Sequence, residues 1–319
     1  MTVVIAMRAG PGIGVACSDR EVTYTYEKGH ERKLRYKGRK IVQMDGNCFV
    51  GFAGDLGAAE RIIYQTRHQL GPDAVYQDIL RALIKNYDAI RQDEVRRHVE
   101  HTLLISWSDF VSGGLSSRMT ESAREMLEDE REKNEVFNVD LLVCGVEEGG
   151  IGEKRDFGIA AYRAPGILEY SRYSESVGIS DMADISTTEF LEALNPRQAK
   201  IGLARCARAV MKAKVLAEKR NPGIGRRGQL VWVDERMHYQ ETSERQTALL
   251  STVLRFQIDA PGLIGDEAAE GVFMDIVERP QSKEERDAVT NSVYARVRDM
   301  IPAEELYRYV LLGDTTAYS

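Results

Sequence analysis

Short apolar runs separated by turn residues open the chain. The runs are Val3–Met7, Gly14–Cys17, Arg35–Met44 and Cys48–Phe52. Gly10-Pro11-Gly12 separates the first two runs and Asp45-Gly46-Asn47 separates the last two, and both tripeptides are typical of tight turns. Short runs of β-branched and small apolar residues favour strands. The pattern therefore predicts two β-hairpins at the start of the chain.

After Leu56 the apolar positions recur at helical spacing, which predicts two helices separated by Gly71-Pro72. Strand patterns return at Val139–Gly145, Phe157–Tyr162, Ile167–Tyr173 and Gln229–Asp234. Two more helices are expected before the last of these strands, one over Met182–Leu194 and one from Pro196 to Ala217. The predicted order is strands, a helix pair, strands, a helix pair and a strand.

This order indicates sheets covered by pairs of helices, an α+β arrangement, and disfavours the alternating units of a doubly wound fold. We expect one domain over residues 2–255, with a charged helical insertion near 112–137 that contains the stretch Arg118–Glu135. Residues 256–319 are expected to form a mostly helical C-terminal extension, with one helix from Lys283 to Met300.

Composition narrows the possible functions. The net charge of -7 comes from acidic and basic residues interleaved along the chain, which disfavours a basic face for nucleic acid. Four scattered cysteines without a CxxC pair indicate neither a zinc site nor a disulfide framework, and no cofactor is expected. The start of the chain lacks a secretory pattern, and no apolar run approaches the ~20 residues that span a bilayer. We therefore expect a cytoplasmic protein without a membrane partner, with Thr2 at or near its mature start.

The start of the chain also carries candidate chemistry. A threonine hydroxyl is a weak nucleophile, but an N-terminal threonine has its own α-amine as a base. A nearby lysine ammonium lowers the pKa of that amine, and an aspartate can hold the lysine in place. Thr2 opens the first predicted strand, Asp19 ends the second, and Lys40 precedes a later apolar strand. These residues are the candidates for such a site.

The segments TVVIAM, GVACSDR, GRKIVQM and FVGFAGD, in this order over the first residues of the chain, resemble proteasome β-subunits and the related bacterial proteolytic ring of the ATP-dependent two-component protease. The resemblance implies a four-layer αββα sandwich of the N-terminal-nucleophile hydrolase type and a threonine protease. It makes Thr2 the nucleophile and base, Asp19 the orienting carboxylate, Lys40 the electrostatic partner, and the Gly51 N–H the oxyanion donor.

Two later segments depart from the family pattern. The family has a Gly-Ser-Gly turn where this chain has Ser176-Val177-Gly178-Ile179-Ser180, and we take Ser180 as the supporting hydroxyl, with Ser176 as the alternative. The family has an Asp-x-x-Ser-Gly turn where this chain has Asn221–Gly225, which lacks both the carboxylate and the hydroxyl. These departures leave open how the threonine amine is held.

For two other motifs we prefer a structural interpretation to a functional one. His98 and His101 are spaced for metal binding on one helix, but Arg96 and Arg97 indicate an exposed polar face. The glycine-rich segment Asn221–Gln229 could cradle phosphate, but it follows a helix and precedes a strand, the reverse of a phosphate-binding loop. We interpret it as a turn.

The sequence therefore predicts a hydrolase that cleaves peptide bonds through a threonyl acyl-enzyme. One alternative is a transpeptidase or protein ligase with the same nucleophile, and another is a non-catalytic, proteasome-like scaffold subunit. The expected partners are a peptide or protein substrate, copies of the chain in a homo-oligomeric ring, and an ATP-dependent unfoldase. The substrate, the ring size and the need for an unfoldase stay open.

Overall fold

A computed structural model of the chain provides the description that follows. The structure describes residues 2–24, 34–44, 47–71, 74–102, 104–112, 121–122, 125, 137–147, 155–163, 166–178, 181–192, 201–221, 224–233, 236, 238–279 and 282–305.

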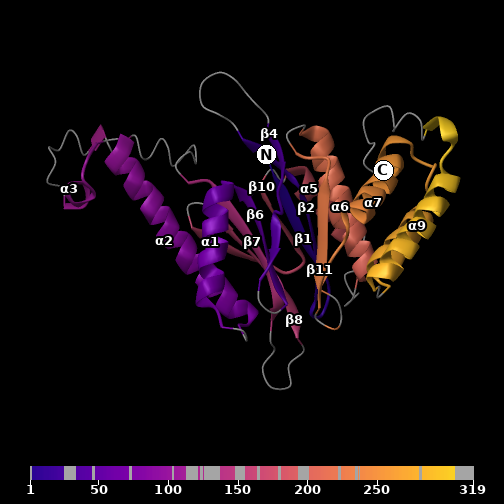
Figure 1. Ribbon diagram of the computed structural model, residues 1–319, viewed down its shortest axis with the longest axis horizontal. Helices are drawn as coiled ribbons and strands as arrows, with labels where there is room; N and C mark the ends of the chain where they lie inside the picture. Colours follow the sequence, from indigo (N-terminus) through magenta and orange to yellow (C-terminus); the bar gives the residue numbers. More distant parts are fainter. Residues whose placement is uncertain are drawn as a thin grey trace.

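Two antiparallel sheets form the centre of the molecule (Figure 1). The first sheet has the order β10 (Ser174–Gly178), β1 (Val3–Gly10), β2 (Ile13–Asp19), β11 (Gly228–Val233) and β12 (Tyr239–Glu241). The second sheet has the order β5 (Ile41–Gln43), β6 (Cys48–Gly54), β7 (Val139–Glu147), β8 (Asp156–Arg163) and β9 (Ile167–Ser171). A separate two-stranded ribbon pairs β3 (Glu21–Tyr24) with β4 (Leu34–Lys37). Both predicted hairpins, β1–β2 and β5–β6, are present.

The two sheets are joined by a buried cluster of apolar side chains. It combines alternate residues of β1 and β2, such as Val4 and Ala16, with residues of the second sheet, such as Phe49 and Leu142. The sheets approach closely enough to require glycine at two places: a Cβ at Gly14 would lie 2.0 Å from Phe157 Cε1, and a Cβ at Gly51 would lie 2.5 Å from Val4 Cγ1. Close contact between the sheets therefore restricts residue size at both glycines.

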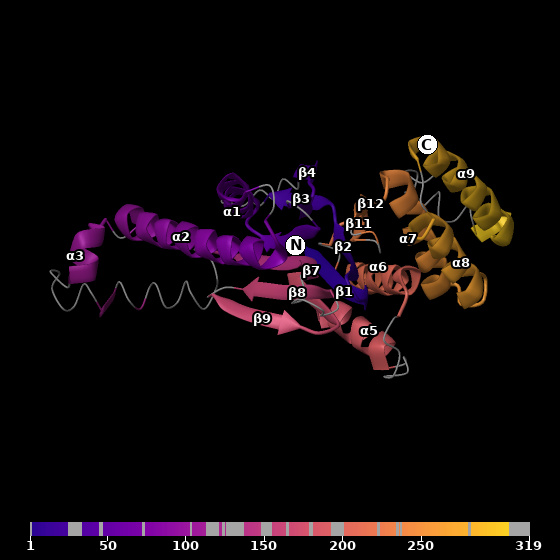
Figure 2. The same ribbon diagram turned by 90° about the horizontal axis from the view of Figure 1, so that it is seen from below.

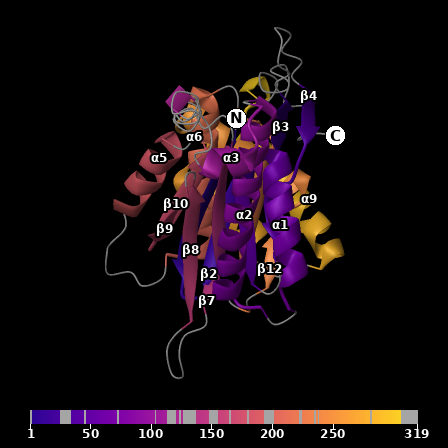
Figure 3. The same ribbon diagram turned by 90° about the vertical axis from the view of Figure 1, so that its left-hand side faces the viewer.

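Helices pack against the other side of each sheet. The helices α1 (Leu56–Gln69) and α2 (Tyr76–Thr102) share a buried cluster with β6 and β7. Figure 3 views the molecule from their side, and Figure 2 shows α2 continuing past the sheets to α3 (Trp107–Ser112). Tyr87 of α2 is fully buried and donates its hydroxyl to the Val139 carbonyl at 2.9 Å, which ties α2 to the second sheet.

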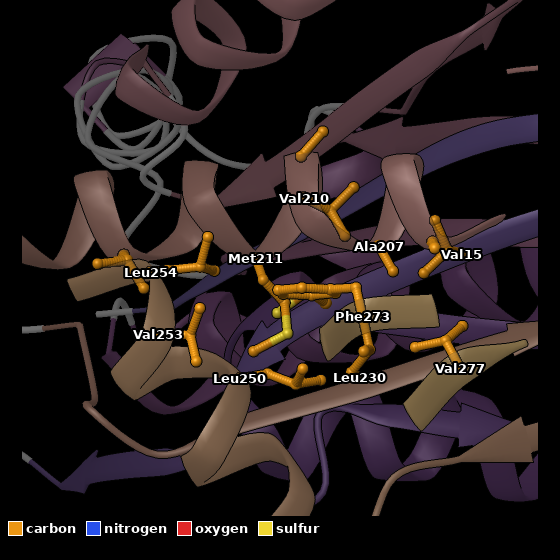
Figure 4. Close-up of a cluster of buried hydrophobic side chains, with 14 of the residues drawn as sticks. Val15, Ala207, Val210, Met211, Leu230, Leu250, Val253, Leu254, Phe273 and Val277 are labelled. Carbon is orange, nitrogen blue, oxygen red and sulfur yellow. The ribbon is translucent and has the colours of Figure 1, made fainter. Parts of the chain in front are cut away.

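The first sheet is covered by a larger helical group. It consists of α5 (Asp181–Glu192), α6 (Leu203–Arg220), α7 (Glu244–Asp259), α8 (Asp266–Val277) and α9 (Lys283–Met300). Figure 4 shows Val210 and Met211 of α6 among Leu250 and Phe273 of the later helices and Leu230 of the sheet. The α+β prediction is confirmed, and the three clusters are compatible with the four-layer sandwich, which we retain as a proposal.

Several predicted boundaries differ from the structure. The run Arg35–Met44 was expected as one strand, but it divides into β4 and β5, which belong to different sheets. The strand β10 had no apolar signal, and it is held by pairing with β1. The predicted start at Pro196 lies outside the described residues, and α6 begins at Leu203. Most of Arg118–Glu135 also lies outside them.

The predicted boundary between residues 255 and 256 falls inside α7. Side chains on both sides of it, such as Leu250 and Phe256, join one cluster with Phe273 of α8 and Val297 of α9. The C-terminal helices therefore share a core with α6 and the first sheet. Within the described ranges, every helix is too short or too polar to cross a membrane.

Candidate functional site

Thr2, Asp19 and Lys40 meet at one end of the two sheets. Lys40 Nζ donates hydrogen bonds to Thr2 Oγ1 at 2.6 Å and to Asp19 Oδ2 at 2.7 Å. Asp19 is fully buried and Lys40 is 3% exposed, whereas Thr2 is partly exposed. The buried Lys40 ammonium, paired with the Asp19 carboxylate, thus points at the hydroxyl of Thr2, the partly exposed residue among the three. We call these three residues the Thr2 site.

Strand pairing explains how distant residues reach this site. Asp19 is the last residue of β2, and the antiparallel register places Ser18 opposite Val4 of β1. Lys40 comes immediately before β5, which belongs to the second sheet. The lysine side chain therefore crosses from one sheet to the other, and its charge is paired where the two sheets meet.

The Asp19 carboxylate is held by two backbone donors in addition to Lys40. The Val3 N–H donates to Oδ1 at 3.1 Å, and the Gly225 N–H donates to Oδ2 at 3.4 Å. Hydrogen bonds from fixed backbone donors hold the carboxylate in one orientation. Gly225 belongs to the segment that lacks the family's Asp and Ser, so this segment reaches the site through its backbone.

The Gly225 segment is itself supported by a second buried ionic cluster, which consists of Lys214, Glu218 and Arg255. Lys214 Nζ donates to Glu218 Oε2 and to the Arg226 carbonyl, both at 2.9 Å. Arg255 Nη2 donates to Glu218 Oε1 at 3.0 Å. Lys214 is fully buried. We call Lys214, Glu218 and Arg255 the loop-support cluster, because it holds the backbone next to Gly225.

Gly178 lies directly against Thr2, and sequence reasoning gave it no separate role. It pairs with Val3 and has φ of 87°, a conformation that favours glycine. A Cβ at this position would lie 2.2 Å from the Thr2 carbonyl oxygen and 3.0 Å from Ala53 Cβ. The end of β10 and the end of β6 therefore enclose the backbone of Thr2, and only glycine fits between them.

Gly51 lies within β6, opposite Ile41 on one side and Leu142 on the other. The next residue, Phe52, donates its N–H to the Lys40 carbonyl at 3.0 Å. Successive N–H groups of a strand point to opposite edges, so the Gly51 N–H faces β7. The oxyanion role of Gly51 stays a prediction, and an available N–H there would require a local opening of the β6–β7 ladder.

Ser180 lies outside the described residues, so its predicted role is not tested. The alternative, Ser176, is fully buried in β10, and its hydroxyl donates to Asp184 Oδ1. The Ser176 carbonyl accepts a hydrogen bond from Arg163 Nη2 at 2.6 Å. The described contacts of Ser176 therefore tie β10 to α5 and β8.

The structure gives no support to a metal site or to a reactive cysteine. Among the residues that the structure describes, no group of three histidine, cysteine or acidic side chains could hold a metal ion. Burial raises the pKa of the Cys17 and Cys206 thiols to about 12, and it also raises the pKa of Cys48 and Cys144. These thiols are therefore protonated at neutral pH, and none of them is an activated nucleophile.

Three comparisons with known proteins bear on the fold. The structure of Anbu (ancestral beta-subunit) from Yersinia bercovieri matches with 14% sequence identity and a TM-score of 0.51, covering 88% of this chain and 99% of that chain. The Gly-1 mutant of Anbu from Hyphomicrobium sp. strain MC1 matches with 12% identity and a TM-score of 0.48, covering 81% and 98%. Residues 266–310 match the family model of the phosphoinositide phosphatase C-terminal domain. No curated protein matches significantly.

These findings correct the family assignment made from the sequence. A solved structure that matches is an Anbu (ancestral beta-subunit) protein, and the family model that matches residues 266–310 is the phosphoinositide phosphatase C-terminal domain, so the assignment to proteasome β-subunits is wrong. The short motifs at the start of the chain were too few to separate related families. At 14% identity, the likeness to the Yersinia protein establishes a shared fold and nothing about activity.

Proposed function

We propose that the chain is an amidohydrolase that uses Thr2 as an N-terminal nucleophile and cleaves peptide bonds. The observation that supports this proposal most strongly is the position of Lys40 Nζ, which donates to Thr2 Oγ1 at 2.6 Å while it is paired with the buried Asp19 at 2.7 Å. An ammonium placed against a hydroxyl favours the alkoxide over the alcohol. A purely structural lysine does not need a partly exposed hydroxyl as its second partner.

The proposed reaction requires Thr2 to become the first residue of the mature chain. Its free α-amine, with an unperturbed pKa of about 7.7 to 8.0, then accepts the proton from Oγ1 as the oxygen attacks the substrate carbonyl. The amine returns that proton to the leaving nitrogen, the peptide bond breaks, and an ester to Thr2 forms. Water attacks this ester and releases the carboxylic acid product, and one proton of the attacking water is transferred to Oγ1.

Lys40 and Asp19 have separate tasks in this scheme. The Lys40 ammonium stabilises the negative charge that develops on Oγ1 and favours the neutral, basic form of the nearby amine. Asp19 keeps Lys40 charged and aimed, because its carboxylate is in turn fixed by the N–H groups of Val3 and Gly225. We propose these roles together with Ser180 as a supporting hydroxyl and with the Gly51 N–H as an oxyanion donor after a local opening of the β6–β7 ladder.

The test uses a peptide epoxyketone, which reacts jointly with the hydroxyl and the amine of an N-terminal threonine. Intact mass and peptide mapping of the treated protein should show one adduct on Thr2 of a chain that lacks Met1. Under an incubation that labels the parent protein completely, the adduct should fall below detection in Asp19→Ala and in Lys40→Ala, where it forms much more slowly. A protein that retains Met1 and forms no adduct would contradict the proposal and favour a non-catalytic scaffold.

Two further properties belong to the same proposal. Hydrolysis and transpeptidation share the acyl-enzyme, so product analysis with an added amine decides between a protease and a protein ligase. The Yersinia protein is named as a subunit, which supports the proposal that this chain assembles with copies of itself, as in a ring. Native mass spectrometry measures that assembly, and the rate on folded substrates with and without an unfoldase measures that partnership.

A further inference from the structure

We infer that Gln229 is a positioning residue for the Thr2 site and that it acts on Lys40 through the backbone of Ile41; this inference rests on the function proposed above. The Ile41 N–H donates to Gln229 Oε1 at 3.1 Å, and Gln229 Nε2 donates to the Ile41 carbonyl at 2.9 Å. The primary amide thus pairs with Ile41 as a neighbouring strand residue would. Ile41 directly follows Lys40, so the amide fixes the point from which the lysine side chain starts.

Gln229 connects the two sheets at the site. It lies on β11 of the first sheet, next to Gly228, which is paired with Asp19 of β2. Ile41 lies on β5 of the second sheet. One side chain therefore links β5, which starts directly after Lys40, to the strand pair that carries the carboxylate of Asp19. The distance between Lys40 and Asp19 depends on the relative position of the sheets, and Gln229 spans the junction beside them.

A carboxylate determines which way the amide points. Gln229 Nε2 also donates to Glu241 Oε1 at 3.1 Å, and a carboxylate only accepts hydrogen bonds, so the amide nitrogen must be on that side. Glu241 Oε1 accepts a second hydrogen bond from Arg20 Nη2 at 2.9 Å. Arg20 follows Asp19 in the chain. The amide is therefore held by a group that is anchored next to the site.

Burial makes these hydrogen bonds consequential. Gln229 is 1% exposed, and both of its donors and its acceptor are used. A buried polar group that loses its partner keeps the full penalty of desolvation, so the backbone of Ile41 would shift to find another partner. A displacement of Lys40 would lengthen its contact with Thr2 Oγ1, and misplacements of about 1 Å can reduce rates about 100-fold.

The test compares Gln229→Met with the parent protein in epoxyketone inactivation. We expect the maximal inactivation rate to fall about 10- to 100-fold with little change in the half-saturating concentration, because the effect is on the nucleophile and not on binding. In a Lys40→Met background the same substitution should cause no further loss, since Gln229 acts through Lys40. Additive losses in the double variant would overturn the inference.

A matched control separates positioning from stability. Asn86 is a buried amide of α2, 3% exposed, that donates to Thr66 Oγ1 at 3.0 Å within the helical layer, away from the Thr2 site. Asn86→Leu should lower the stability and leave the maximal inactivation rate unchanged. If the Gln229→Met variant does not fold, Gln229→Asn is used in its place. Asparagine keeps the primary amide but has one methylene fewer, so the amide no longer reaches Ile41.

Crystal structures separate this inference from the proposed function. If the parent protein retains Met1 and forms no adduct, the proposed function fails, but the geometry can still be measured. The inference predicts that the distance between Lys40 Nζ and Thr2 Oγ1 increases by about 1 Å or more in the Gln229 variant. An unchanged distance would overturn it, whatever the activity of the parent protein.

Discussion

Two buried lysines of this protein each pair with a carboxylate but differ in their second hydrogen-bond partner. Lys40 pairs with Asp19 and Lys214 pairs with Glu218, at 2.7 Å and 2.9 Å, and both lysines are almost fully buried. Lys40 extends to the hydroxyl of Thr2, whereas Lys214 extends to a backbone carbonyl, that of Arg226. A buried ion pair alone therefore does not indicate a candidate catalytic site. The proposal for Thr2 depends on the hydroxyl that Lys40 contacts, whereas Lys214 contacts a backbone carbonyl.

The two sites are also connected. Lys214 Nζ donates to the Arg226 carbonyl, and the residue directly before Arg226, Gly225, donates its N–H to Asp19. The loop-support cluster therefore holds the loop from which Gly225 donates to Asp19. Its effect on Thr2 is transmitted through one loop, and we expect it to be weaker than that of Lys40.

The largest expected effect is that of Lys40→Met. The rate of inactivation by the epoxyketone should fall about 1,000-fold or more, because the group that touches Oγ1 is removed. The unfolding free energy should also fall, by about 3–5 kcal/mol, because Asp19 is left buried without its counter-charge. Urea denaturation and inactivation kinetics measure the two quantities. In Asp19→Asn/Lys40→Met the stability should partly recover and the rate should not; joint recovery would contradict the assigned roles.

Lys214→Met should affect the stability more than the inactivation rate. Stability should fall by about 1–3 kcal/mol, because Glu218 loses one partner but keeps Arg255. The inactivation rate should fall by about 10-fold or less, since only the support of Gly225 is weakened. The same two measurements apply. A rate loss as large as that of Lys40→Met would mean that the loop-support cluster belongs to the reaction itself.

The smallest expected effect concerns Cys17. Burial has the largest influence on the pKa of this thiol and keeps it protonated, and the nearby charges of Lys214 and Asp19 have smaller influences. Iodoacetamide at pH 8 should leave the native thiol and the inactivation rate unchanged, and it should label the thiol in urea. Rapid labelling of native Cys17 with loss of activity would challenge Thr2 as the nucleophile.

The same burial has a consequence for pH dependence. The unfolded thiol loses its proton above pH ~9, whereas the folded pKa of Cys17 is raised to about 12. The native state therefore holds more protons than the unfolded state between these values, and its stability should fall as the pH rises through that window. Urea midpoints at pH 8 and pH 10 measure this loss, which should be smaller in Cys17→Ala.

The sequence by itself determined the local elements and the order of the candidate residues. Apolar periodicity depends on near neighbours in the chain, so the strands around Thr2, Asp19 and Gly51 and the helix from Lys283 to Met300 were predictable. The same reasoning missed β10, whose residues form a strand because β1 provides a partner. It also placed a domain boundary within α7, because a shared core leaves no mark in a local pattern.

Only the tertiary structure decided what surrounds the Thr2 site. Gly178, Gly225 and Gln229 are distant from Thr2 in the sequence. The segments of the two glycines were compared with the family's supporting turns, but neither glycine, nor Gln229, was itself predicted to act at the site. They reach the site because the register of β10 and β11 and the support of the loop by Lys214 place them there. Residue types near the start of the chain specify which chemistry is possible, and long-range packing specifies which groups hold it in place.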